Sequence, residues 1–598
     1  MTKKFYVTTA IDYVNAEPHI GHAYQKIVAD VIARWNSKNG SEVLFVTGTD
    51  EYGKKVKEAS KKVGKNPKDF VDEISEKFKE AWKDLDISYT RFIRTTDKDH
   101  HEVVIDFIKK CEETGDIYLG EYEGLYCVGC EAYYTEKDCP DGKCLLHNRP
   151  LEKIKEKSYF FRLSKYQDFL LDLYDKHPEF ILPKSRRNEI INRVKCGLND
   201  LSITRTSFNW GIPFPLDKSH VTYVWFDALI NYYTATREKG REDFWPADVH
   251  LLGKDNTWFH TVYWPAMLKS AGIKLPKTTF NHGFISFNGQ KISKSLGNAI
   301  SPRTLVSKYG SDSVRYFCLR QFAFAEGNDG DFNESALIQR HNDELANKLG
   351  NLVSRVSSLV EKQGIEKTTN KLIKELDKKK IDKLFSEFAF DKVLNEIFSF
   401  IDICNEYIQN KKPWETPDKK VLYELVESIK VIGELLEPFI PKSAKKIFEV
   451  FSGEKIKKAP VLFEKIEFVS DLKQNINKDV EIDEIMEGVA QIGFEDFEKL
   501  DLRVSEIEQV EEIPGADKLY KLNINTGLDN RTICAGIKEF YSHDDLRGKK
   551  IIVLTNLKPK KLKGIESHGM LLAAANLDHT RLSLLCPDSD MEVGARVG

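Results

Sequence analysis

Alternating runs of apolar and polar residues divide the first part of the chain into strands and helices. "FYVTTAI" and "EVLFVTGTD" are rich in β-branched and aromatic residues and predict strands, whereas residues 23–39 and 67–84 carry the apolar spacing of amphipathic helices. Strands that alternate with helices favour a parallel sheet built from βαβ units. Residues 1–117 therefore predict half of a doubly wound α/β domain.

The alternation stops and then resumes. Residues 118–218 hold tyrosines, clustered cysteines and "FNWGIPFPLD", after which the strand-like runs "VTYVWFDAL" and "DVHLLGKD" follow. An inserted module between two halves of one sheet explains this order most simply. We expect residues 1–117 and 219–335 to form one split Rossmann-like domain, with residues 118–218 inserted in it.

The remainder of the chain changes character twice. Long amphipathic patterns such as "NDELANKLGNLVSRVSSLVEK" predict an α-helical bundle over residues 336–470. Polar residues 471–492 predict a linker, and residues 493–598 hold short strands and turns typical of a small OB-fold β-barrel. The predicted fold is therefore that of a multidomain α/β protein.

Composition supports this division and excludes some classes. The chain has 598 residues, more than the ~250–300 that a single core usually holds. With 41% hydrophobic and 31% charged residues and no apolar run near ~18 residues, no membrane partner is expected. The start "MTKKFYVTTAIDYV" lacks the apolar region of a signal peptide, so we expect a cytoplasmic protein. Because the formal net charge is -3, binding of a polyanion would have to rely on local basic patches of the chain.

A first candidate site lies in "TTAIDYVNAEPHIGHAY", where a strand leads into a helix. Pro18 suits the first helical turn, which puts His19 and His22 on one face of the helix N-terminus. Unpaired N–H groups there favour phosphate, and Gly21 lets a ligand approach the backbone. The alternative is a pair of ordinary surface or core histidines.

A second candidate is "NHGFISFNGQKISKSLGNAIS", which carries Lys291, Ser293 and Lys294 in a Gly- and Ser-rich loop. Lysines on such a loop can close on a triphosphate and neutralise the charge that develops during adenylyl transfer. Considered alone, the segment favours a solvated basic loop.

Together, "HIGH" and "KISKS" resemble the paired signatures of class I aminoacyl-tRNA synthetases. "TGTDEYG", "YVWFDAL", "GKDNTWFH", "WPAML" and "KPW" narrow this to a resemblance to the methionyl-tRNA synthetase family along nearly the whole chain. The resemblance implies that ATP, accompanied by Mg²⁺, activates L-methionine to methionyl-adenylate with release of diphosphate. Methionine then passes to a ribose hydroxyl of tRNA(Met), and AMP is released.

The resemblance also implies roles for single residues. His19, His22, Lys291 and Lys294 would be catalytic, and with Gly21 and Ser293 they would bind ATP. Asp50 would hold the substrate ammonium, and Arg205 would lie near the active site. The methionine pocket would comprise Ala10, Ile11, Tyr13, Asp50, Trp225, Ala228, Leu229, Tyr232 and His260. The family commonly has histidine in place of Tyr52, and some members have proline in place of Leu229. Without the resemblance, the aromatic residues of the predicted pocket would suit an ordinary core.

Four residues of the insertion have the spacing of a zinc site. Cys127 and Cys130 form C-x2-C, and Cys144 and His147 form C-x2-H. Two such knuckles supply four ligands in a tetrahedron, which leaves no open position, so we expect one structural Zn²⁺. Cys139 in place of His147 gives an alternative set.

By resemblance, Asn351, Arg355, Asn405 and Trp414 of the helical domain would meet the anticodon of the tRNA. Lys558, Lys560, Lys561 and Lys563 crowd one loop of the barrel and predict a nonspecific phosphate contact. The barrel resembles a tRNA-binding module that commonly dimerises, so a homodimer is expected.

Two rival interpretations fit the same features. One is a tRNA carrier whose synthetase body has lost activity, which the intact pair of signatures and Asp50 disfavour. The other is a related synthetase for a different amino acid. Exchange of pyrophosphate into ATP, driven by each amino acid in turn, separates all three.

Overall fold

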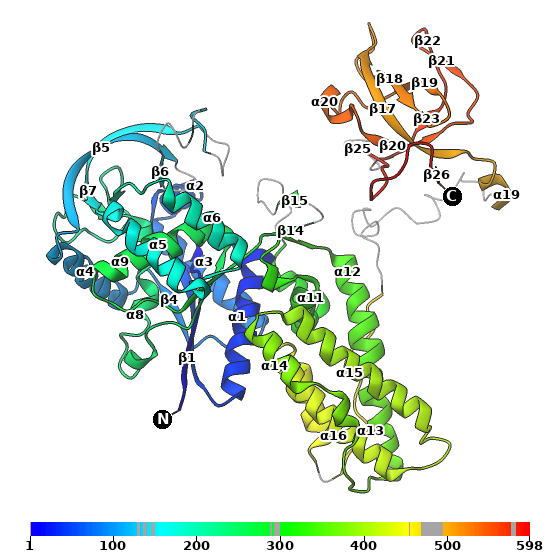
Figure 1. The fold of residues 1–598 in the computed structure, drawn as a ribbon, viewed down its shortest axis with the longest axis horizontal. Coiled ribbons are helices and arrows are strands. Elements are labelled where there is room, and N and C mark those ends of the chain that lie inside the picture. The colour runs from blue at the N-terminus through cyan, green and yellow to red at the C-terminus, as the bar shows by residue number, and fades with distance from the viewer. Residues whose placement is uncertain are drawn as a thin grey trace. The chain divides into compact units, whose positions relative to one another are not determined.

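The computed structural model describes residues 2–127, 132–134, 139, 141–144, 150–287, 290–291, 300–453, 455–467, 494–575 and 582–597. The chain divides into two compact units, Met1–Phe468 and Val469–Gly598 (Figure 1). Each unit buries hydrophobic clusters of its own. No helix of the described ranges is both long and apolar enough to cross a membrane.

A seven-stranded parallel sheet forms the centre of the first unit. Its order is β2-β3-β1-β12-β13-β8, with β4 beside β3. The strands are β1 (Lys4–Thr9), β2 (Asp12–Tyr13), β3 (Glu42–Asp50), β4 (Arg91–Arg94), β8 (Ile181–Leu182), β12 (Val249–Gly253) and β13 (Thr278–His282). The chain passes from β1 to β3 on one side and later returns to β12 on the other. The point where the strand order reverses therefore lies beside β1, where open α/β sheets bind ligands.

Three helices pack against this sheet early in the chain: α1 (Ile20–Lys38), α3 (Pro67–Asp84) and α4 (Lys98–Glu113). The predicted helix 67–84 is confirmed by α3, because Asn66 caps its N-terminus and Pro67 occupies its first turn. Helix α1 begins later than Pro18 suggested. His19 is its cap residue, so Pro18 lies outside the helix.

The inserted segment forms a four-stranded sheet in the order β6-β5-β7-β9. Its elements are β5 (Ile117–Cys127), β6 (Ala132–Tyr134), β7 (Glu152–Phe161), α5 (Gln167–Lys176), α6 (Lys184–Lys195) and β9 (Leu201–Ser202). Strand β8 also lies within residues 118–218, yet it pairs with β13. This segment therefore contributes an edge strand to the central sheet as well as a sheet of its own.

The predicted strand "VTYVWFDAL" is wrong. Only β11 (Val221–Thr222) is extended, and the chain then forms the short helices α7 (Val224–Ala228) and α8 (Asn231–Thr234). A short apolar run that is buried on all sides has no period that separates strand from helix. Helical turns here let Trp225 stack on Phe259, with ring centroids 3.7 Å apart.

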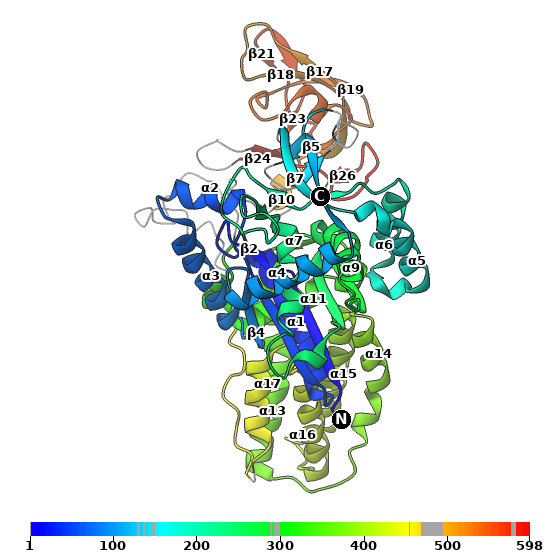
Figure 2. The same ribbon diagram turned by 90° about the vertical axis from the view of Figure 1, so that its left-hand side faces the viewer.

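Helices fill the rest of the first unit. They are α11 (Ser311–Gln321), α12 (Glu334–Arg340), a π-helical segment (His341–Gly350), α13 (Asn351–Gln363), α14 (Lys378–Ser386), α15 (Phe390–Lys411), α16 (Lys419–Leu436) and α17 (Pro441–Phe451). The predicted end of strands near residue 335 is confirmed for the described part of this region. Helices α13, α15 and α16 gather at one end, away from α5 and α6 (Figure 2).

Arg315 of α11 joins the helical region to the sheet region. It is fully buried, and its guanidinium lies 2.7 Å from the carboxylate of Asp30 on α1. It also donates to the backbone carbonyls of Pro438 and Phe439, which precede α17. A planar cation with several donors can satisfy all these acceptors in an otherwise apolar contact.

The second unit is a barrel-like antiparallel β domain. Its main sheet has the order β19-β18-β17-β20-β23, and β26 pairs with β17. The strands are β17 (Leu502–Glu512), β18 (Tyr520–Asn525), β19 (Asn530–Ala535), β20 (Lys550–Leu554), β23 (Met570–Leu571) and β26 (Arg596–Val597). The hairpin of β21 (Lys560–Leu562) and β22 (Ile565–Ser567) carries three of the four predicted lysines, and Lys558 precedes it.

Candidate active site

A cavity of about 450 Å³ lies at the carboxyl edge of the central sheet. Ala10 follows β1, Asp50 ends β3, Gly253 ends β12 and His282 ends β13, and all four line the cavity. Because parallel strands end at the same edge, residues from distant segments converge there. The cavity is therefore placed where the topology favours ligand binding.

His19 and His22 line this cavity, and backbone contacts fix their tautomers. The N–H of Gly21 donates to His19 Nδ1 at 3.1 Å, and the N–H of His19 donates to His22 Nδ1 at 3.2 Å. Since both Nδ1 atoms accept, the proton of each neutral ring is on Nε2. With ring centroids 3.8 Å apart, the pair offers two N–H donors beside the N-terminus of α1.

Gly21 leaves room for the His19 ring. A Cβ at this position would lie 3.0 Å from the His19 ring. The sequence "HIGH" thus lets two imidazoles and a helix N-terminus share one wall.

Every residue predicted for methionine binding lines the same cavity. Tyr232 and His260 are its best-defined polar pair, with Tyr232 Oη 2.7 Å from His260 Nε2. His260 Nδ1 donates to the Asn256 carbonyl at 2.9 Å, so Nε2 accepts and the tyrosine hydroxyl donates. Burial lowers the pKa of His260 to about 4, which keeps this ring neutral. The members of the set are Ala10, Ile11, Tyr13, Asp50, Trp225, Ala228, Leu229, Tyr232 and His260.

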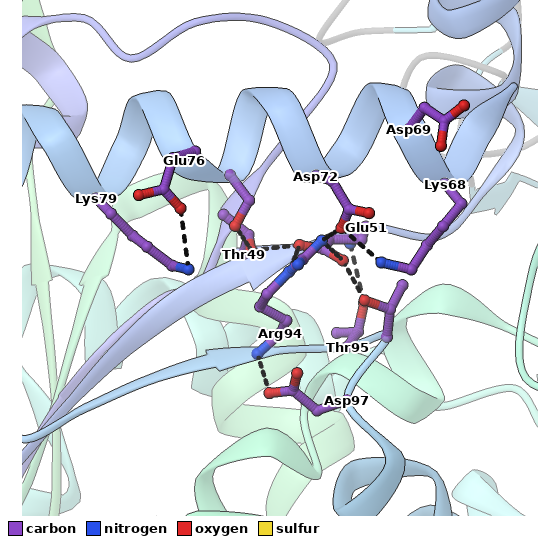
Figure 3. A network of polar contacts seen from close by, with 12 residues as sticks. Thr49, Glu51, Lys68, Asp69, Asp72, Glu76, Lys79, Arg94, Thr95 and Asp97 are labelled. Atoms are coloured by element: carbon purple, nitrogen blue, oxygen red, sulfur yellow. Dashed lines mark hydrogen bonds and ion pairs between the residues drawn. The ribbon is translucent and has the colours of Figure 1, made fainter. Parts of the chain in front are cut away.

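Asp50 is held in place by its neighbour Glu51. The buried Glu51 carboxylate accepts from Arg94 Nε at 2.6 Å and Arg94 Nη2 at 3.0 Å, and from Thr96 Oγ1 at 2.5 Å. Arg94 also pairs with Asp72 of α3, as Figure 3 shows. This polar network fixes the chain where β3 ends, and therefore the direction in which Asp50 leaves the sheet.

The second signature begins close to the cavity. Phe284 and Ile285 line it, and the next residue, Ser286, pairs with Lys291 in the hairpin of β14 (Ile285–Phe287) and β15 (Gln290–Lys291). The backbone of Lys291 thus lies one strand away from a cavity-lining segment. Ser293 and Lys294 fall outside the described residues.

Arg205 and Tyr52, which the sequence singled out, do not line the cavity. Arg205, expected near the active site, lies in β10 (Thr204–Arg205) with its guanidinium 4.3 Å from the centre of the Tyr223 ring. Tyr52 bonds to His101 at 2.8 Å. Lining residues that the sequence interpretation missed are Asp12, Gln25, Lys55, Asp255 and His282. Helical spacing could have found Gln25, which follows His22 by three positions on α1.

Three cysteines of the cluster between residues 127 and 144 are described. Cys127, Cys139 and Cys144 are each 1% exposed, and none forms a disulfide. The described residues contain no group of three or more potential metal ligands. Cys130 and His147 lie outside them.

The residues expected to meet tRNA are at the surface. Asn351 and Arg355 lie one turn apart on α13 and are exposed. Asn405 donates to the Lys348 carbonyl at 3.3 Å, and Gln363 donates to the Pro413 carbonyl at 2.9 Å. The first contact puts Asn405 near the start of α13, and the second puts the half-exposed Trp414 near its end. Lys558, Lys560, Lys561 and Lys563 are exposed in the second unit.

A doubly wound sheet with "HIGH" at its switch point defines a class I aminoacyl-tRNA synthetase. The family described as "tRNA synthetases class I (M)" matches residues 5–148 and 137–357. "Anticodon-binding domain of tRNA ligase" matches residues 363–508, and "Putative tRNA binding domain" matches residues 502–596.

Similar sequences identify the branch of that class. Methionine–tRNA ligase of Caldanaerobacter subterraneus subsp. tengcongensis is 43% identical, with 100% of both chains covered. Methionine–tRNA ligase of Thermotoga maritima is 41% identical, with 99% of this chain and 100% of the relative covered. The chain belongs to the methionine–tRNA ligase family.

Solved structures agree with this assignment. Mycobacterium tuberculosis methionyl-tRNA synthetase in complex with methionyl-adenylate superimposes with a TM-score of 0.73 at 38% identity, over 77% of this chain and 99% of that chain. Its apo form gives a TM-score of 0.68 at 35% identity.

Proposed function

We propose that the cavity binds L-methionine and ATP side by side and forms methionyl-adenylate within it. The observation that carries this proposal is the convergence of His19, His22 and Asp50 with the aromatic residues Trp225 and Tyr232 on one cavity. These residues come from segments more than two hundred positions apart, and the topology alone unites them. A neutral, aromatic pocket suits the polarizable thioether of methionine.

The chemistry requires positioning and charge stabilisation. The methionine carboxylate attacks the α-phosphorus of ATP, the bond to the pyrophosphate oxygen breaks, and pyrophosphate leaves. The Nε2–H groups of His19 and His22 are oriented to donate to phosphate oxygens, and Asp50 holds the substrate ammonium. Lys291 and Lys294 complete the positive surroundings. Mg²⁺ accompanying ATP would supply further neutralisation of the phosphates when bound.

Exchange of labelled pyrophosphate into ATP tests this proposal directly. We expect exchange with methionine and at least about a hundredfold less with other amino acids, since the pocket has to match the side chain. Absence of exchange with every amino acid would identify a tRNA carrier. Strong exchange with a different amino acid would identify another synthetase.

For the insertion, we propose one structural Zn²⁺ held by Cys127, Cys130, Cys144 and His147. Buried, reduced thiols at Cys127 and Cys144 support it, since a small module gains stability when a metal joins its cysteines. Cys139 is equally buried and remains the alternative fourth ligand. Metal analysis should find one zinc per chain and less in Cys144→Ser. Loss of zinc in Cys139→Ser, with retention in His147→Ala, would favour the alternative set.

For tRNA, we propose that the surface formed by Asn351, Arg355, Asn405 and Trp414 reads the anticodon and that the barrel lysines grip phosphates. Exposed aromatic and amide groups are what unpaired bases need for stacking and edge recognition. Trp414→Ala should lower tRNA charging about tenfold, the loss of one base stack, and spare pyrophosphate exchange. Val461→Ala, which trims another exposed apolar residue, is the matched control. Equal loss of charging and exchange would contradict this assignment.

We also propose a homodimer formed through the second unit.

A further inference from the structure

Beneath the cavity lies a buried ion pair that the reaction as described does not use. Lys26 of α1 is 0% exposed and Asp12 of β2 is 6% exposed, and Lys26 Nζ lies 2.5 Å from Asp12 Oδ1. Asp12 lines the cavity between Ile11 and Tyr13. Burying two charges is costly unless further hydrogen bonds satisfy the remaining donors and acceptors of the pair.

All three protons of the Lys26 ammonium are committed. Besides Asp12 Oδ1, they reach the Ala10 carbonyl at 3.3 Å and Gln25 Oε1 at 3.2 Å. Gln25 in turn donates through Nε2 to His282 Nε2, because His282 Nδ1 donates to the Gly283 carbonyl. Lys26 therefore has no hydrogen to offer the second oxygen of Asp12.

Asp12 Oδ2 is buried and has no hydrogen-bond partner among the described residues. The nearby Tyr232, whose pKa is raised mainly by burial and further by Asp12 and Asp50, gives its hydroxyl proton to His260. A buried carboxylate oxygen without a donor is costly, and Asp12 is a lining residue of the cavity, so we expect a bound ligand to supply the missing donor. Burial raises the pKa of Asp12 to about 6 against the opposing effect of Lys26, which leaves the group ionised at neutral pH.

We propose that Asp12 Oδ2 accepts a hydrogen bond from the substrate ammonium, so that Asp12 and Asp50 hold this group together while Lys26 orients Asp12. This rests on the proposed function of the cavity. Asp12 of β2 and Asp50 of β3 come from neighbouring strands, and both residues line the cavity close enough to Tyr232 for their charges to raise its pKa. Two carboxylates and one lysine leave a net charge of about minus one, which complements one ammonium.

The test compares binding of four ligands to the full chain and to Asp12→Asn. The probes are L-methionine, methioninol, which keeps the ammonium but lacks the carboxylate, 4-(methylsulfanyl)butanoate, which lacks the ammonium, and ATP. We expect methionine and methioninol to bind about 10- to 100-fold more weakly to Asp12→Asn, as for a lost charged hydrogen bond. The other two ligands should change less than about twofold, since neither presents an ammonium.

Two further variants separate this role from a structural one. Asp12→Asn combined with Lys26→Gln removes both charges and should stay weak for methionine; full recovery would mean that only the unpaired Lys26 was harmful. Asp116→Asn removes another fully buried carboxylate that pairs with a lysine, at 2.7 Å from Lys165 and away from the cavity, and should leave all four affinities unchanged.

Three outcomes would overturn the proposal. Equal weakening of all four ligands would show a general disturbance of the cavity. Weakening of ATP alone would assign Asp12 to the nucleotide. Unchanged affinities would mean that solvent satisfies Oδ2. Pyrophosphate exchange by the wild-type chain with methionine does not depend on any of these three outcomes. The proposal for Asp12 can therefore fail while the proposed function stands.

Discussion

At the scale of single residues, burial removes positive charge from the inner histidines of the first unit. Burial lowers the pKa of His260 and of His282 to about 4, and it lowers the pKa of His250 well below its ordinary value. These rings therefore serve as neutral hydrogen-bonding groups at physiological pH. Positive charge for a triphosphate must come from lysines and from the N-terminus of α1. The groups that recognise the amino acid are therefore different from the groups that would neutralise the phosphates.

Tyr232→Phe tests the recognition side. The substitution removes the donor to His260 Nε2 and leaves that buried nitrogen unsatisfied. We expect the KM for methionine to rise about tenfold, as for one lost hydrogen bond in a dry site, with a smaller change in the KM for ATP. Pyrophosphate exchange at varied concentrations of each substrate measures both. Tyr233→Phe on the same helix, whose ring is only partly buried, is the control.

His100→Phe tests the effect of pH on stability. His100 Nδ1 bonds Thr234 Oγ1, His100 Nε2 has no partner among the described residues, and burial lowers the pKa to about 3. The unfolded chain thus binds a proton below about pH 6.5 that the folded chain refuses, so stability falls as the pH drops through this window.

Between about pH 8 and about pH 5, His100 should lower the free energy of unfolding by about 2 kcal/mol. The His100→Phe variant should not show this loss. Urea unfolding followed by tryptophan fluorescence measures it. Replacement of the exposed His177 by Gln should recover nothing. An unchanged pH dependence in His100→Phe would contradict the argument.

At the scale of elements, the site depends on how each strand of the sheet ends. Strand β1 is followed by the buried turn of Ala10, and β3 by the Glu51 clamp. Strand β13 is followed by Gly283, where a Cβ would come within 2.0 Å of the Asn328 carbonyl oxygen. Each ending is fixed by a contact from a different part of the chain, so the cavity is preorganised before any ligand binds.

Arg94→Met tests the clamp on β3. It leaves the fully buried Glu51 without its cation, which should lower the free energy of unfolding by about 3 to 5 kcal/mol. The KM for methionine should also rise, because Asp50 is the preceding residue. Arg303→Met is the matched control: Arg303 pairs with two carboxylates at the surface, and its loss should leave the free energy of unfolding nearly unchanged.

Sequence reasoning succeeded where a local signal specified the local structure. Helix α3 was predicted because its residues carry amphipathic apolar spacing, and strand β12 because a strand-like apolar run resumes in "DVHLLGKD". It failed for "VTYVWFDAL", where burial on all sides hides the period. It also missed Asp12 and Lys26, because charged residues normally face solvent and only the fold brings these two together in the interior.

At the scale of the whole molecule, the cavity and the lysines proposed to grip tRNA phosphates belong to different units. The cavity, the sheet and the helical bundle share the unit Met1–Phe468, whereas the exposed lysines of the β21–β22 hairpin belong to Val469–Gly598. The net charge of -3 gives no general attraction to RNA, so the proposed phosphate contact depends on local patches such as this one. The solved mycobacterial chain matches 77% of this chain, a share close to that of the first unit.

Removal of residues 469–598 should therefore leave a folded enzyme that still exchanges pyrophosphate at nearly the full rate. Its KM for tRNA should rise, and the dependence of that KM on salt should become shallower, because phosphate contacts of Lys558, Lys560, Lys561 and Lys563 are lost. Replacing these four lysines by Gln in the full chain should reproduce the salt effect without truncation. Sedimentation of the two forms measures the oligomeric state, and we expect a dimer only for the full chain. A shortened chain that stays dimeric would move the subunit contact to the first unit. One that loses exchange would show that the adenylate chemistry needs the barrel domain.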